Sequence, residues 1–360
     1  MKHNHRNILK VTTLASTVAA ATLSLAQATY HITELAPAAG YSSTVGYALN
    51  DRGEAVGASQ PIAPYFNGVA TLWRNGQSTI LGKVPKGNYS TAEAISSLGV
   101  ITGEGDDGSF RPQAVTFKGG VASIFDSGAN NSRGIFVSDN GFIVGDYLKG
   151  FGNAGWNPAI WTADPKKPGQ YKRLFLPHYA DPTGAASYNY ANGANNLGQV
   201  VGQISSSQWS ARGGLWNTDS AHSLTLLSPL PNEWDSYANG INDLGVIVGI
   251  SDVGVFSTTP VVWSADASHT VQALPLLPNE AFGYAVGINN SGQIIGSHGS
   301  LSQPCVWIDG QLIDLQAALD ATGAGWTLSG VSDINNSGQI VGTGMFNGQA
   351  RGFVLTPNNL

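Results

Sequence analysis

The chain is poor in charged residues, which make up 11% of its 360 residues, and it contains a single cysteine, Cys305. One thiol cannot form a disulfide within the chain, so we expect stability to come from packing. The formal net charge is -6 at pH 7. This balance does not suit nucleic acid, whose binding depends on Lys and Arg meeting phosphates. After residue 28 no stretch is apolar enough to cross a membrane. We therefore expect neither a nucleic-acid partner nor a membrane-embedded protein.

Glycine is abundant by contrast, and many of the 46 glycines belong to one cassette that recurs seven times. Its clearest copies are residues 287–296, GINNSGQIIG, and residues 333–342, DINNSGQIVG. The equivalent turn glycines are separated by 46, 42, 57, 47, 47 and 46 residues. A period in the forties built from short strands is typical of a propeller. These glycines are Gly53, Gly99, Gly141, Gly198, Gly245, Gly292 and Gly338.

The repeat between residues 284 and 315 has the pattern of one propeller blade. Strands are expected at residues 285–288 and 293–296, joined by a turn in which Asn and Gly take the positive φ of a tight hairpin. Two more strands are expected at residues 304–307 and 311–315, the last with alternating apolar side chains. Four antiparallel strands per repeat form a blade.

The two ends of the repeat region complement each other. Residues 30–35 match a fourth strand, and residues 351–355 match a third strand in a repeat that lacks its fourth. Pairing them completes the seventh blade, closes the ring and covers exposed strand edges. The sequence therefore predicts an all-β, seven-bladed β-propeller with four antiparallel strands per blade, as a single domain over residues 29–360.

Residues 1–28 have the features of a secretory signal peptide. Lys2, Arg6 and Lys10 precede a short apolar stretch at residues 11–25, and Ala26–Ala28 supplies a small-x-small cleavage site. We expect cleavage after Ala28 and a protein that is secreted or periplasmic.

One large side chain recurs in the predicted third strand of each repeat. A residue repeated in every blade is best explained as packing between neighbouring blades, because aromatic side chains dominate core energetics. These residues are Trp73, Phe117, Trp161, Trp216, Trp263 and Trp307, with Leu355 in the last copy.

Together, the cassette, the period and the signal peptide resemble the bacterial extracellular HAF-repeat family over residues 29–357. In that family the third strand tends to read His-Ala-Phe-Leu-Trp. The resemblance implies a propeller-type repeat protein outside the cytoplasm and assigns no activity to specific residues. Here the histidine position holds Val69, Gln113, Asn157, Arg212, Thr259, Gln303 and Arg351.

Chain direction alternates within a blade, so the connections fall on two faces. The short-turn face carries the terse turns between strands one and two and between strands three and four. The long-loop face carries the other, longer connections, which are where function is expected on a rigid scaffold. Its non-repeating aromatics suit sugar rings, although aromatic residues also pack beneath their own loops. The candidate ligand-binding residues are Trp209, Trp234, Tyr190, Tyr237 and Trp326.

These features favour a binding or scaffolding module for carbohydrate or another extracellular polymer. One alternative is a polysaccharide lyase or glycosidase in the ring mouth, with His178 and Tyr188 as candidate acid–base groups and Arg212 as the neutralising cation. Another is a protein–protein interaction platform. Whether the protein is an enzyme stays open.

Metal and cofactor sites have little support in the sequence. The histidines after residue 28 are widely spaced, and no His-Glu-x-x-His or nucleophile-elbow motif occurs. The acidic segment at residues 104–109 is a weak Ca²⁺ candidate, because hard cations prefer clustered carboxylates. A solvent-exposed acidic loop is the better interpretation. We expect no metal, no cofactor and a monomer.

Overall fold

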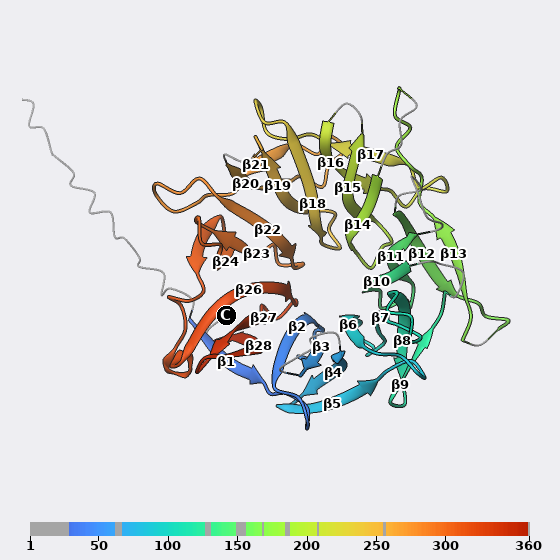
Figure 1. The fold of residues 1–360 in the computed structure, drawn as a ribbon. Coiled ribbons are helices and arrows are strands. Elements are labelled where there is room, and N and C mark those ends of the chain that lie inside the picture. The colour runs from blue at the N-terminus through green and yellow to red at the C-terminus, as the bar shows by residue number, and fades with distance from the viewer. Residues whose placement is uncertain are drawn as a thin grey trace, which may run out of the picture.

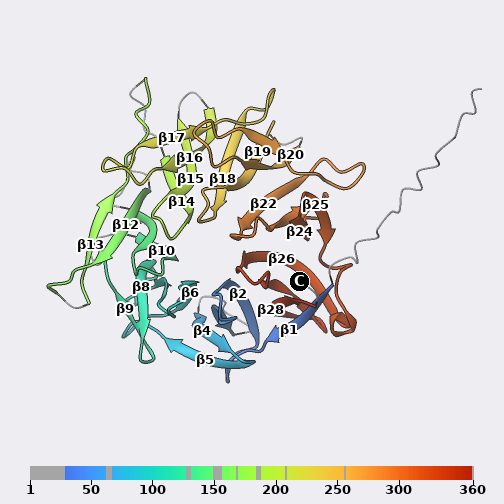
Figure 2. The same ribbon diagram turned by 180° about the vertical axis from the view of Figure 1, so that it is seen from behind.

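The computed structural model describes residues 29–61, 67–126, 131–148, 156–167, 169–183, 188–206, 209–254 and 257–358. They form seven four-stranded antiparallel sheets arranged as blades around a central channel (Figures 1 and 2). This confirms the predicted seven-bladed propeller. The predicted signal peptide lies outside the described residues. No helix in the described ranges is long and apolar enough to span a membrane.

Each blade presents its first strand to the channel, and the remaining strands follow outward in order (Figure 1). The inner strands of blades I to VII are β2 (Ser43–Leu49), β6 (Ser90–Ile95), β10 (Asn131–Val137), β14 (Tyr188–Ala194), β18 (Asp235–Ile241), β22 (Gly283–Ile288) and β26 (Trp326–Ile334). The second strands are β3 (Ala55–Gln60), β7 (Ile101–Gly105), β11 (Ile143–Leu148), β15 (Val200–Ser206), β19 (Ile247–Asp252), β23 (Ile294–His298) and β27 (Ile340–Phe346).

The outer half of each blade repeats the same plan. The third strands are β4 (Val69–Arg74), β8 (Gln113–Lys118), β12 (Asn157–Ala163), β16 (Trp209–Trp216), β20 (Thr258–Trp263), β24 (Gln303–Ile308) and β28 (Gln349–Pro357). The outermost strands are β5 (Gln77–Gly82), β9 (Val121–Ile124), β13 (Tyr171–Phe175), β17 (Leu224–Leu227), β21 (Val271–Ala273), β25 (Gln311–Asp314) and β1 (Tyr30–Leu35), and a 3-10 turn, η2 (Ala321–Gly323), precedes β26.

The ring closes as the sequence predicts. β1 pairs antiparallel with β28, with Ile32 opposite Leu355, so the first described strand is the outermost strand of the last blade. Tyr30, Ile32 and Leu355 are buried in one core cluster with residues of blades VI and VII. Closure is therefore supported by apolar burial as well as by the strand ladder.

The repeated third-strand tryptophans are packing residues, as predicted. Trp161, Trp216, Trp263 and Trp307 are at most 1% exposed, and Trp73 is 2% exposed. Each indole also donates its N–H to an oxygen in the link that leads into its own blade. The acceptors, in chain order, are the Ala36 carbonyl, the Asp126 carboxylate and the carbonyls of Pro177, Ser228 and Pro275, at 2.7–2.8 Å.

The cassette turns fasten neighbouring blades together, a role that the sequence did not reveal. Gly292 has the expected positive φ of 80°, whereas Asn289 and Asn290 do not. The Asn289 side-chain oxygen accepts the N–H groups of Ser291 and Gln293, and its amide donates to the Asn335 carbonyl in the next blade at 3.0 Å. The asparagine is therefore a latch between blades. The same amide-to-carbonyl bond joins Asn50 to Ser96, Asn195 to Asn242, Asn242 to Asn289, and Asn335 to Asn50.

The residues that follow the latch positions form a second series of hydrogen bonds, which spans six of the seven blade junctions. Each backbone N–H donates to the side-chain oxygen of the equivalent residue in the next blade, as from Asp243 to Asn290 at 2.9 Å. Side-chain amides add to the series, because Asn196 and Asn290 donate to Asp243 Oδ2 at 3.2 and 3.0 Å, and Asn336 donates to Asp51 Oδ2 at 2.9 Å. The other pairs are Ser97–Asp139, Asp139–Asn196, Asn196–Asp243, Asn290–Asn336 and Asn336–Asp51.

Candidate functional site

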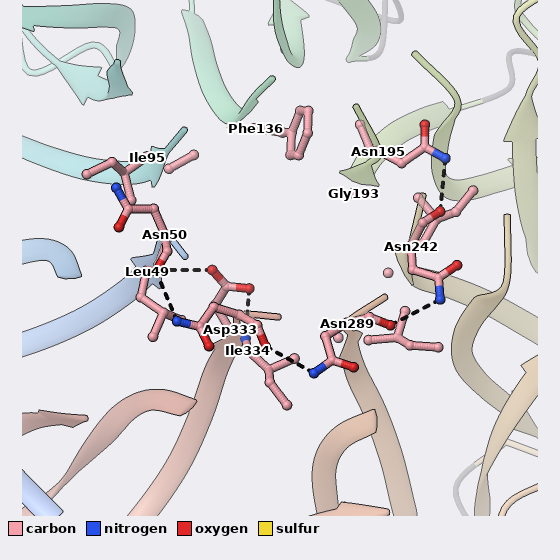
Figure 3. Close-up of a pocket in the computed structure, with 18 of the residues that line it drawn as sticks. Leu49, Asn50, Ile95, Phe136, Gly193, Asn195, Asn242, Asn289, Asp333 and Ile334 are labelled. Carbon is pink, nitrogen blue, oxygen red and sulfur yellow. Dashed lines mark hydrogen bonds between the residues drawn. The ribbon is translucent and has the colours of Figure 1, made fainter. Parts of the chain in front are cut away.

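A cavity of about 290 Å³ lies in the channel at its short-turn end (Figure 3). The last residues of all seven inner strands line it, together with the cassette turns that follow them. The sequence pointed to the long-loop face instead. The difference arises because the inner strands, which carry few distinctive residues, converge only when the ring has closed.

Each inner strand carries a β-bulge at the same position, and the unpaired residue lines the cavity. A bulge disrupts the ladder locally and re-aims a side chain. A glycine that recurs in the second strand of every blade makes room for this bulge. A Cβ on Gly249 would lie 1.9 Å from the Tyr237 carbonyl oxygen, and the other six blades show the same contact at 1.8–2.2 Å. The bulged residues are Tyr47, Glu93, Ile135, Asn192, Asn239, Val286 and Ser332.

The cavity is lined by acidic groups. No Lys, Arg or His side chain occurs among the described residues that line it. Five carboxyl groups do, and the remaining polar groups are mainly asparagine amides and serine hydroxyls. The carboxyl groups belong to Asp51, Glu93, Asp139, Asp243 and Asp333.

Asp333 departs from the repeat. Its carboxylate accepts the backbone N–H of Leu49 at 3.0 Å and that of Ile334 at 2.8 Å, and it lies between them at the edge of the ring (Figure 3). Burial raises the pKa of the Asp333 carboxyl to about 7, the Asp51 charge adds to this, and the two N–H donors act against it. The equivalent residues of blades I to VI are Ala48, Ala94, Phe136, Gly193, Gly240 and Gly287.

A second group of titratable side chains surrounds Glu93. Burial raises the pKa of Glu93, and burial together with the Glu93 charge raises the pKa of Glu104 to about 7. Arg133 lowers both pKa values through its positive charge. The guanidinium is held by Asp146, whose Oδ2 accepts from Nε at 3.0 Å and from Nη2 at 2.7 Å. Asp146 is fully buried, and its other oxygen accepts the Ala191 N–H at 2.9 Å.

On the long-loop face, Trp234 has the most exposed aromatic side chain of the described residues, at 66%. Its backbone is nevertheless fixed, because the N–H donates to the Asp252 carbonyl at 2.8 Å and the carbonyl accepts from Arg212 Nη1. The preceding residue, Glu233, accepts the Thr259 hydroxyl through Oε1 at 2.9 Å. Its buried Oε2 has no hydrogen-bond partner among the described residues.

The other predicted ligand-binding residues have different surroundings. Tyr190 and Tyr237 lie on the inner strands β14 and β18 and are half-buried. Burial raises the pKa of both phenols, and nearby carboxylates add to the effect. The structure corrects the expectation for Trp326, which is only 7% exposed because it stacks on Phe346 with ring centroids 4.9 Å apart. Trp209 lies in β16, and its side chain is outside the description.

The predicted catalytic residues are each engaged in separate contacts. The two ring nitrogens of His178 contact Asn157 Oδ1 at 2.5 Å and Asn189 Nδ2 at 2.6 Å, between blades III and IV. Arg212 instead contacts the link between blades IV and V, where its Nη1 lies 3.5 Å from Asp235 Oδ1. Tyr188, 41% exposed, begins β14. His178 and Arg212 therefore bridge two different blade junctions, and they do not form one cluster.

Comparisons with known proteins support the fold alone. No family model matches the chain, and no curated protein matches its sequence. Virginiamycin B lyase from Staphylococcus aureus is similar in structure, with a TM-score of 0.52 and 13% identity over 91% of this chain and 99% of that chain. An acylaminoacyl peptidase from Pyrococcus horikoshii has a TM-score of 0.54 and 12% identity, over 89% of this chain and 52% of that chain. Such identities show a shared propeller architecture, and one fold hosts many functions. The HAF-repeat resemblance stays a prediction.

The acidic segment at residues 104–109 is a solvent-exposed loop only in part, because residues 107–109 are exposed whereas Glu104 and Gly105 belong to β7 and Asp106 is buried. Asp106 is fully buried, and its carboxylate accepts the N–H groups of Asn88 at 2.7 Å, Gly108 at 3.0 Å and Phe110 at 2.9 Å. These donors lower the pKa of Asp106 against the opposing effect of burial. Among the described residues, no group of three or more His, Cys, Asp or Glu side chains is placed to hold a metal ion.

Sequence reasoning missed the residues that line the cavity, above all Asp333 and Glu93. One signal was present. When the seven repeats are aligned on the cassette, Asp333 is an acid at a position otherwise held by small or apolar residues. A departure from an internal consensus marks a candidate functional position.

Proposed function

We propose that the protein is a secreted or periplasmic binding module for carbohydrate or another extracellular polymer, which it contacts through the long-loop face. The observation that supports this most directly is Trp234, an indole two-thirds exposed on a backbone held by two hydrogen bonds. A rigid aromatic platform costs little ordering when it binds. Its flat apolar face suits the C–H face of a sugar ring, and its N–H remains available to a hydroxyl.

Polar groups beside the platform fit the same ligand. Glu233, next to the platform, has a buried carboxylate oxygen with no partner among the described residues, and such an acceptor gains from any donor that ligand binding brings within reach. Sugar hydroxyls are such donors. Tyr188 is exposed at the same end of the neighbouring inner strand, and Tyr190 and Tyr237 follow on β14 and β18. An extended polymer could therefore contact blades IV and V together.

Retention on immobilised polysaccharides tests this proposal. We expect the wild-type protein to be retained on at least one gel of a plant, algal or bacterial polysaccharide series, and Trp234→Ala to lose about tenfold or more in affinity. Trp234→Phe should retain part of the affinity, because it keeps an aromatic face. Leu301→Ser is the control, since Leu301 is 81% exposed in the connection between β23 and β24 on the same face. Absence of retention across the series, or equal retention of all variants, would count against the proposal.

Export is a separate part of the proposal and depends on residues 1–28. Expression in a Gram-negative host should give a periplasmic or extracellular protein whose N-terminus is Thr29. Mass spectrometry of the purified protein checks this. A chain that keeps residues 1–28 and stays in the cytoplasm contradicts it.

A polysaccharide lyase or glycosidase is a second candidate, and the Glu93–Glu104 pair favours it over the residues named from the sequence. Two interacting carboxyl groups with raised pKa values are a common basis for acid–base chemistry. Assays for new reducing ends and for unsaturated ends on the polysaccharide series test this candidate. Activity that Glu104→Gln abolishes and His178→Ala leaves unchanged would support it, and absence of activity in the wild type would remove it.

A further inference from the structure

Leucines occupy three of the seven third positions of the cassette turns around the short-turn mouth of the channel. Leu98, Leu197 and Leu244 are 70%, 63% and 66% exposed. Each occupies the third position of a cassette turn and directly follows a residue that lines the cavity. Isolated exposed leucines are ordinary, but three around one opening are a feature of interaction surfaces.

The described residues that line this mouth include five carboxyl groups and no cationic side chain. Asp51, Asp139 and Asp243 belong to the turns, and Asp333 and Glu93 lie deeper in the cavity. Arg52 is the only cationic residue in the seven cassette turns, and it shares the Glu54 carboxylate with Arg74. An anionic cavity with low-dielectric walls attracts a cation and repels an anionic polymer.

The size of the cavity restricts the occupant. At about 290 Å³ it is at the lower limit of small-molecule pockets, so it suits one inserted side chain better than a polymer. Lysine and arginine combine a charged head with an apolar stem, which matches carboxyl groups within and leucines at the rim. A central anchor surrounded by apolar contacts is the usual arrangement of an interface hot spot.

We propose that this mouth is a docking site for a protein partner, which inserts one lysine or arginine side chain into the cavity and places flanking apolar residues on Leu98, Leu197 and Leu244. Asp333 is the carboxylate that meets the inserted cation, since it is the deviation from the internal repeat in the wall of the cavity. The site lies on the opposite face from the long-loop site, so an experiment can contradict either proposal without affecting the other.

The probe is a fluorescein-labelled peptide with the sequence Gly-Leu-Lys-Leu-Gly, and a matched peptide carries Gln in place of Lys. Binding to the purified protein is measured by fluorescence anisotropy at low ionic strength, because screening weakens such contacts. Asp333→Asn removes the inner carboxyl group. Asp243→Asn removes a rim charge and keeps the oxygen that accepts the Asn196 N–H, while the two amide donors to Oδ2 lose their acceptor. Leu197→Ser combined with Leu244→Ser tests the rim, and Leu301→Ser is an exposed-leucine control on the other face.

We expect the Lys peptide to bind about tenfold or more tightly than the Gln peptide, because the Gln peptide cannot pair with a carboxylate. Asp333→Asn and the double leucine variant should each weaken the Lys peptide by a similar factor, Asp243→Asn should weaken it less, and Leu301→Ser should leave it unchanged. Equal affinity for both peptides, no binding of either, or unchanged binding by both Asp333→Asn and Asp243→Asn would overturn the proposal. Polysaccharide retention by these variants should match the wild type, which separates this site from the long-loop site.

Discussion

The side-chain amide of Asn335 donates to the backbone carbonyl of Asn50 at 3.0 Å, although 285 residues separate the two. The same bond joins other blades across 46 or 47 residues. The ring is thus closed twice. At the channel the asparagine latch joins blade VII to blade I, and at the circumference β1 completes the sheet of blade VII.

Removing this latch should destabilise the closed ring. Asn335→Ala leaves the Asn50 carbonyl and the N–H groups of Ser337 and Gln339 without a side-chain partner. We expect the free energy of unfolding to fall by about 1–3 kcal/mol. Urea denaturation followed by tryptophan fluorescence measures it. The neighbouring Ser337→Ala should change it by less than about 0.5 kcal/mol, because Ser337 is exposed and the latch uses only its backbone N–H. Equal losses in both variants would show that the latch is not specific.

A second prediction concerns the second-strand glycine that makes room for each bulge. Gly249→Ala places a Cβ against the Tyr237 carbonyl oxygen, a backbone atom that cannot move without altering the bulge. We expect a loss of about 3 kcal/mol or more, or failure to fold. Gly330→Ala is the matched control, since a Cβ there meets nothing within 4 Å. That variant should be neutral or stabilising by up to about 1 kcal/mol. A Gly249→Ala protein as stable as the Gly330→Ala protein contradicts the role given to this contact.

Substitutions of two tryptophans should distinguish a packing role from a surface role. Trp216 is fully buried and donates to the Pro177 carbonyl at 2.8 Å, whereas Trp234 is 66% exposed. We expect Trp216→Ala to lower the free energy of unfolding by about 3–5 kcal/mol, because it leaves a large cavity between blades. Trp234→Ala should lower it by less than about 0.5 kcal/mol. Thermal denaturation of both variants measures the difference, and similar melting temperatures would refute it.

Glu104 links stability to pH. Its pKa of about 7 is raised first by burial and then by Glu93, whereas an unfolded glutamate titrates near about 4.3. Between those values the folded chain holds a proton that the unfolded chain has released, so stability falls as the pH rises through this window. Glu104→Gln keeps the neutral form. We expect it to gain stability relative to the wild type between about pH 5 and about pH 8. Urea denaturation across this range measures the gap, and a gap that does not change with pH argues against the shift.

The fold could be predicted closely because its determinants repeat. Seven cassettes set the number of blades, and the strand at residues 30–35 pairs with β28 as expected. The repeated tryptophans were correctly interpreted as packing residues for the same reason. In each case, the sequence shows the same physical requirement several times.

The cavity was not predictable in the same way, because residues about 46 positions apart meet only after closure. The β-bulges have no sequence signal until the glycine contact explains them. Trp326 resembles an exposed loop aromatic in sequence, but its burial depends on Phe346 and Phe353, which arrive from two other strands. Arg212 resembles a catalytic cation, but it holds the backbone of Trp234.

The seven bulged residues occupy equivalent positions along their inner strands, and their side chains take no part in the strand ladder. Tyrosine, glutamate, isoleucine, asparagine, valine and serine already occupy these places. The residues that face the channel can therefore be substituted one blade at a time without altering the strand framework. Descendants of one ancestral ring could acquire unrelated specificities with few substitutions, and a protein engineer could write a chosen pattern into the same seven places.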